Sequence, residues 1–75
     1  MEDLISFVAK SLVDNPEAVE VRKIDGGRTV VYELRVDESD RGRVIGRNGQ
    51  TIQALRTLIK AAAASDHKPV LEIPG

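Results

Sequence analysis

The chain has 75 residues, of which 41% are hydrophobic and 31% charged, and this is the balance of one small globular domain. It contains no cysteine, which excludes a disulfide framework and a thiolate metal site. The longest apolar run, Ala61 to Ala64, is far shorter than the ~20 residues of a membrane span, and the acidic start MEDLISF does not fit a signal peptide. We therefore expect a single domain over residues 1–75, in the cytoplasm and without a membrane partner.

Positive charge is concentrated in one segment, although the net charge of the chain is only −1. Residues 1–40 carry ten acids and five bases (−5), residues 41–60 carry five bases and no acid (+5), and residues 61–75 carry one base and two acids (−1). A neutral or acidic chain would ordinarily be a poor binder of polyanions, because such binding needs a basic surface. In this chain the segment 41–60 supplies a local basic surface.

The first predicted elements are a helix and a hairpin. Leu4, Val8 and Leu12 have helical spacing, which predicts a helix over residues 3–14 that stops at Asn15-Pro16. Two runs rich in β-branched residues follow, and the Asp25-Gly26-Gly27 turn between them predicts a β-hairpin. The predicted strands are 19–24 and 29–36, with Val30, Tyr32, Leu34 and Val36 of the second strand facing the core. Tyr32 is therefore interpreted as a core residue.

The second half of the chain predicts two helices around a glycine loop and then a last strand. The acidic residues 37–40 are expected to cap the first of these helices, because their side-chain oxygens can accept its free amide hydrogens. The expected elements are a short helix over 40–45, the loop Gly46 to Gly49, a longer helix over 50–64, a break over 65–69 and a strand over 70–73.

The glycine loop has the features of an anion site. Without β-carbons at Gly46 and Gly49, a phosphate can approach the main chain, and the amide hydrogens that begin the next helix point toward it. Arg47 and Asn48 add donors within the loop. The alternative is that the glycines only make a tight turn, with Arg41, Arg43 and Arg56 on a solvated face. A nucleotide-hydrolase phosphate loop is excluded, because Gln50-Thr51 replaces the required Lys-Ser or Lys-Thr.

The string VIGRNGQTI, residues 44–52, resembles the signature of the KH domain, which is an aliphatic pair, Gly-x-x-Gly and a downstream aliphatic residue between two helices. Over the whole chain, LVDNPEAVEVR, ELRV, GRVIGRNGQTIQALRTLIKAAAA and VLEI resemble the small bacterial KH proteins of the KhpA type. The resemblance implies an α+β, type II KH-like fold of order α-β-β-α-α-β. In that fold, three helices cover one face of a three-stranded sheet.

The resemblance also implies a function. Members of this family bind single-stranded RNA without catalysis, are regarded as RNA chaperones and post-transcriptional regulators, and form homodimers. They also form heteromers with a larger KH-containing protein of the KhpB/Jag type in the control of cell-wall growth and cell shape. No cofactor, metal or catalytic residue is implied.

In KH domains about four nucleotides lie along a groove, with their backbone held by the Gly-x-x-Gly loop. By resemblance the loop wall is 43–49, the floor is formed by Val44, Ile45, Ile52 and the strand 70–73, and the other wall is 65–69. A basic residue usually follows the second glycine, and here it is Gln50, so we expect the loss of one phosphate contact. The predicted RNA-binding residues are Arg43, Val44, Ile45, Gly46, Arg47, Asn48, Gly49, Gln50, Ile52 and Arg56. Because Phe7 and Tyr32 are the only aromatic residues, we expect a weak and broad base preference.

Two other functions are weighed against this one. A protein-interaction module, with incidental RNA binding, fits the small core and the apolar surface of the first and the alanine-rich helices. An enzyme is disfavoured, because there is no paired nucleophile and base, and the acids 37–40 are explained by capping. The single histidine, His67, is interpreted as a surface residue.

Overall fold

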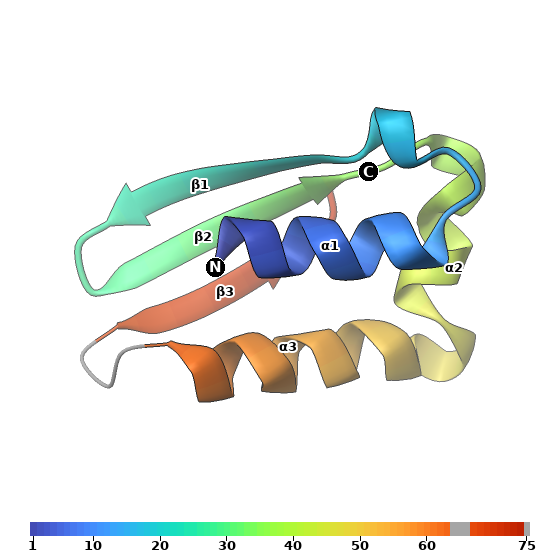
Figure 1. Cartoon of the computed structure of the whole chain (residues 1–75). Helices are drawn as coiled ribbons and strands as arrows, with labels where there is room; N and C mark the ends of the chain where they lie inside the picture. The colour runs from blue at the N-terminus through green and yellow to red at the C-terminus, as the bar shows by residue number, and fades with distance from the viewer. Residues whose placement is uncertain (64–66, 75) are drawn as a thin grey trace.

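The computed structural model describes residues 1–63 and 67–74, and its elements follow the predicted order (Figure 1). Its helices and strands are α1 (Glu2–Leu12), β1 (Glu20–Gly26), β2 (Thr29–Arg35), α2 (Arg41–Ile45), α3 (Gln50–Ala62) and β3 (Lys68–Glu72). Short 3₁₀ helices also occur at η1 (Pro16–Ala18), η2 (Glu38–Asp40) and η3 (Arg47–Gly49). The α+β class and the α-β-β-α-α-β order are confirmed. No helix within the described ranges is long and apolar enough to cross a membrane.

The three strands form a mixed sheet in the order β1-β2-β3. β1 pairs with β2 in the antiparallel direction, with Val21 opposite Leu34, and β3 pairs with β2 in the parallel direction, with Val70 opposite Val31. Along β2 the buried side chains alternate with half-buried or exposed ones. One face of the sheet is therefore covered and the other is open, as the alternation predicted.

The core lies between the sheet and the helices that cross its covered face (Figure 1). Leu34 at the centre of the sheet is fully buried, as is Ile5 of α1, and Ile59 of α3 is 1% exposed. Tyr32 is 6% exposed, which confirms it as a core residue. Both α1 and α3 contact strands, whereas the short helix α2 contacts α1 and α3 at one end of the molecule (Figure 1). The Gly-x-x-Gly loop thus lies at that end.

Four predicted boundaries were wrong by about two residues, namely the ends of α1, β1 and α3 and the start of β3. Helix α1 ends at Leu12 rather than at residue 14, because Val13 is extended and the following link is held by Asp40. Strand β3 runs over 68–72 rather than 70–73, so it includes Pro69. The Lys68 amide donates to Arg28 O on the β2 side, so the nitrogen of Pro69 points to the free edge, where no ladder bond is lost. Helix α3 ends at Ala62 rather than at residue 64, because Ala63 is extended, and strand β1 continues to Gly26 rather than ending at residue 24. Residues 65 and 66 of the predicted break lie outside the described residues.

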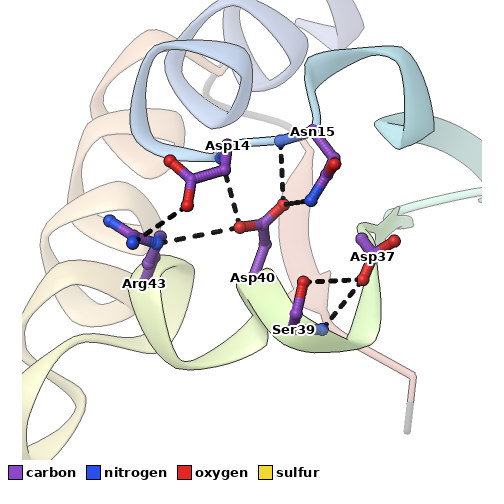
Figure 2. A network of polar contacts seen from close by, with 6 residues as sticks. All are labelled: Asp14, Asn15, Asp37, Ser39, Asp40 and Arg43. Atoms are coloured by element: carbon purple, nitrogen blue, oxygen red, sulfur yellow. Dashed lines mark hydrogen bonds and ion pairs between the residues drawn. The ribbon is translucent and has the colours of Figure 1, made fainter.

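The acidic loop 37–40 does cap a helix, but not in the way predicted. Asp37 accepts hydrogen bonds from the Ser39 amide at 3.0 Å and the Ser39 hydroxyl at 2.8 Å, and so caps η2 (Figure 2). Asp40 stands at the N-cap position of α2 but makes no capping bond to it. Its carboxylate turns instead to the link after α1, where other amide hydrogens need acceptors.

Candidate nucleic-acid interface

The loop between α2 and α3 is built from left-handed backbone conformations. The φ angles of Gly46, Asn48 and Gly49 are 78°, 56° and 74°. Glycine adopts such angles without strain, and asparagine tolerates the left-handed region better than most residues. The sequence Gly-Arg-Asn-Gly therefore matches the conformation of the loop residue by residue, and Arg47 is the one member without a positive φ.

The two glycines differ in the space around them. A β-carbon on Gly46 would lie 2.7 Å from Thr51 Cβ and 2.9 Å from the Thr51 backbone nitrogen, and would also meet the Thr51 hydroxyl. A β-carbon on Gly49 would meet only Ile52 Cγ2, at 3.9 Å. Gly46 thus lets the loop pack directly on the first turn of α3, whereas Gly49 is required for its φ alone.

The N-terminus of α3 has neither a side-chain cap nor an acidic residue near it. Gly49 is its N-cap residue and supplies no side-chain cap, and the first turn contains no acidic residue. The Gln50 amide donates to Arg47 O, which closes the loop against the helix. The positive end of the α3 dipole therefore faces the loop without a carboxylate to neutralise it.

Arg47 supplies free positive charge at this place. Its side chain and that of Asn48 are exposed, and within residues 1–63 and 67–74 neither forms a hydrogen bond or ion pair. The other arginines of the basic segment are engaged: Arg41 donates to Pro74 O, and Arg56 donates to Leu71 O from Nη2 at 3.2 Å and from Nε at 3.4 Å. The Arg56 bond places that residue beside β3, the strand predicted to form the groove floor.

Arg43 lies between two carboxylates (Figure 2). Its Nη2 is 3.0 Å from Asp14 Oδ2, and its Nε is 3.7 Å from Asp40 Oδ1. Asp40 is only 1% exposed, yet its oxygens accept hydrogen bonds from the Asp14 amide, the Asn15 amide and the Asn15 side chain at 3.0–3.1 Å. Burial raises the pKa of Asp40, but these three hydrogen bonds and the charge of Arg43 outweigh it, so the pKa lies below its ordinary value.

The aliphatic residues around the loop divide into core and surface. Val44 is fully buried and Ile52 is 5% exposed, so their side chains support the loop from below. Ile45 is half-buried, which settles the open question of which member of the Val44-Ile45 pair packs inward. Gln50, after the second glycine, is exposed. In this conformation Ile45 offers more apolar surface to a ligand than Val44 does.

The predicted site residues follow one another along α2, the loop and α3. Three lie on α2 (Arg43, Val44 and Ile45), the four loop residues follow, and Gln50, Ile52 and Arg56 lie on α3. The predicted groove wall 65–69 falls partly on residues 64–66, which lie outside the described residues. A separate cavity of about 300 Å³ is lined by Lys23, Tyr32, Ala62 and His67 among others, and it includes no residue of the basic segment 41–60.

Sequence reasoning missed the residues that anchor α2. Asp40 is 26 positions from Asp14 and 25 from Asn15 in sequence, and no local pattern connects it with them. The available signal was Asp40 itself, an acid directly before a helix with three arginine residues nearby, which was assigned to capping. No group of three or more possible metal ligands occurs in the described residues.

The fold and the loop together define a KH domain. The family model described as "KhpA/KhpB, KH domain" matches residues 2–73. The chain belongs to this KhpA/KhpB family of KH domains. No solved structure gave a significant match.

Curated relatives cover nearly the whole chain. The RNA-binding protein KhpA of Caldanaerobacter subterraneus subsp. tengcongensis is 49% identical over 71 residues, which is 95% of this chain and 95% of the relative. The protein of the same name in Borreliella burgdorferi is 46% identical over 72 residues, with 95% and 88% coverage. That of Chlamydia trachomatis is 42% identical over 74 residues, with 97% and 95% coverage. Each of these relatives is named as an RNA-binding protein.

Proposed function

We propose that this protein binds single-stranded RNA and holds the RNA backbone with the Gly46–Gly49 loop. The observation that carries the proposal is a free, exposed Arg47 on a loop that packs against the uncapped N-terminus of α3. The curated relatives named as RNA-binding proteins support the same assignment.

In this proposal, the phosphates lie over the loop and the bases turn toward the apolar side. The Arg47 guanidinium contacts the phosphate oxygens beside the positive end of the α3 dipole, and the Asn48 side-chain amide adds a hydrogen bond. Ile45, which is half-buried at the end of α2, offers apolar contact to the bases. Tyr32 is in the core and Phe7 lies on α1, outside the proposed site, so no aromatic ring belongs to the proposed site and the base preference is broad.

The proposal is tested by measuring the binding of a labelled mixed-sequence RNA to the wild type and to Arg47→Asp/Asn48→Asp over a salt series. Each lost phosphate contact lowers the salt slope for a single strand by ~0.7, so the variant should bind more weakly and with a flatter slope. Arg47→Asp is compared singly with Arg28→Asp, because both change the net charge by the same amount. Arg28 lies in the β1–β2 turn, at the opposite end of the molecule (Figure 1). Equal losses in these two single variants would reject the loop as the binding site.

The family resemblance supports a finer proposal. The protein acts in the cytoplasm as a non-catalytic RNA chaperone and post-transcriptional regulator, alone as a homodimer or together with a KhpB/Jag-type partner. Through that partner it takes part in the control of cell-wall growth and cell shape. Deletion of the gene, with cell dimensions measured by microscopy, tests this role. Complementation by the Arg47→Asp/Asn48→Asp variant would then show that RNA binding is dispensable for it.

A second candidate function is a protein-interaction module, and exposed apolar side chains favour it. Phe7 of α1 is 71% exposed and Leu58 of α3 is 45% exposed. Large apolar side chains at the surface are a common feature of protein interfaces. Light scattering of the wild type, Phe7→Ser and Leu58→Ser measures the self-association. A monomeric wild type that captures no KhpB/Jag-type partner would reject this candidate.

A further inference from the structure

The two carboxylates beside Arg43, those of Asp40 and Asp14, differ in the other contacts that they make. Asp40 is buried, and its two oxygens are occupied by three hydrogen bonds from the link after α1. The Asp14 side chain is 68% exposed, and its carboxylate contacts Arg43 alone among residues 1–63 and 67–74. The Asp14 carboxylate therefore contributes nothing visible to the structure except a partner for Arg43.

Arg43 is placed close to the proposed RNA-binding loop. It lies in the last turn of α2, three residues before Gly46, which ends that helix and begins the loop. The Arg43 side chain is 56% exposed, so the ion pair with Asp14 is open to solvent. An exposed ion pair of this kind is weak, and a phosphate can replace the carboxylate as the partner of the guanidinium.

We propose that Asp14 competes with RNA phosphate for Arg43 and so limits the affinity of this protein for RNA. The inference rests on the proposed function and adds an internal regulator to the same site. Removal of the Asp14 charge does not remove the anchor of α2, because the bond from Asp14 to Asp40 is donated by the backbone amide. Arg43 then keeps its contact with Asp40 and gains a free face for RNA.

The test is a double-mutant cycle of RNA binding over a salt series with the wild type, Asp14→Asn, Arg43→Gln and the double variant. Asp14→Asn should bind RNA about two- to five-fold more tightly at low salt. Its salt slope should be steeper by up to ~0.7, because Arg43 then neutralises a phosphate. When Arg43 is already replaced by Gln, Asp14→Asn should raise the affinity for RNA by no more than Asp3→Asn does. Asp3 is a matched control, because it is exposed and lies in the first turn of α1.

Two results would overturn the inference. One is equal or weaker binding by Asp14→Asn, and the other is a gain in affinity that persists when Arg43 is absent. Thermal melts followed by circular dichroism check the fold of each variant, and Arg43→Lys repeats the cycle if Arg43→Gln is unfolded. Arg47→Asp in the same series reports on the proposed function separately. If Arg47→Asp binds RNA as tightly as the wild type does, the proposal that the Gly46–Gly49 loop holds RNA is rejected. If Arg47→Asp binds weakly but the double-mutant cycle shows no coupling between Asp14 and Arg43, only the role of Asp14 is rejected.

Discussion

At the scale of single residues, the loop depends on glycine for two different physical reasons. Gly46 needs both a positive φ and the absence of a β-carbon, because Thr51 lies directly against it. Gly49 needs only the positive φ. The Gly-x-x-Gly pattern in the sequence does not show this difference, since it depends on how α3 packs under the loop.

Substitution of the two glycines should therefore have unequal effects on stability. Gly46→Ala combines backbone strain with a steric clash and should lower the free energy of unfolding by about 2–4 kcal/mol. Gly49→Ala introduces the strain alone and should cost about 1–2 kcal/mol. Urea denaturation of both variants measures the difference. Equal losses would mean that the clash at Thr51 is relieved by a small shift.

At the scale of elements, one buried carboxylate joins α1 to α2. Asp40 stands at the start of α2 and accepts hydrogen bonds from the link that follows α1 (Figure 2). This contact positions α2, and with it the loop, relative to the rest of the fold. The free energy of this link depends on pH, because the carboxylate must be ionised to accept all three hydrogen bonds and to attract Arg43.

The sign of the pH dependence follows from the lowered pKa of Asp40. Its stabilising contribution is complete above the unfolded-state pKa, which is near 3.8, and is lost as the pH falls through the lower folded-state pKa. Asp40→Asn should therefore be less stable than the wild type at neutral pH, and the two should converge in acid. Urea unfolding between pH 2 and pH 7 measures both, with Asp3→Asn as the control. A constant stability difference across this range would contradict the assignment.

Elements that depend on interactions between residues close in sequence were predicted, whereas boundaries that depend on distant contacts were not. The helical spacing of Leu4 and Val8, the Asp25-Gly26-Gly27 turn and the glycine loop are local signals, and the elements that they predicted are present. The end of α1 and the start of β3 depend on contacts with Asp40 and Arg28, far away in sequence. Such contacts leave no local pattern, so these boundaries could not be placed.

The candidate site was likewise predictable only where it depends on residues close together in the sequence. Glycine, arginine and asparagine in one short loop indicated an anion site directly, whereas the state of each arginine did not follow from the sequence. Arg43 and Arg56 are engaged by distant partners, and only the structure separates them from the free Arg47. The burial of Val44 similarly required the packing of α2 on its neighbours.

At the scale of the whole molecule, stability depends on one small core and leaves little reserve. A domain of this length has a free energy of unfolding of roughly 4–11 kcal/mol, so a single large cavity removes much of it. Consecutive residues of α3 illustrate the contrast between core and surface. Ile59 is 1% exposed and Leu58 is 45% exposed.

Truncation of these two neighbouring side chains should lower the free energy of unfolding by clearly different amounts. Ile59→Ala should lower the free energy of unfolding by about 2–5 kcal/mol, whereas Leu58→Ala should cost less than about 1 kcal/mol in the monomer. Urea denaturation at low protein concentration makes the comparison. A loss in Leu58→Ala as large as that in Ile59→Ala would show that Leu58 is covered in solution, as the protein-interaction candidate requires.

The central claim is that RNA binds at the end of the molecule where α2 meets α3. The most direct measurement is a titration of ¹⁵N-labelled protein with single-stranded RNA, followed by the chemical shifts of the backbone amides. The account predicts shifts concentrated in residues 43–52, with the β1–β2 turn at residues 25–28 unchanged. Shifts concentrated on the open face of the sheet, at Arg22, Glu33 and Glu72, would contradict it.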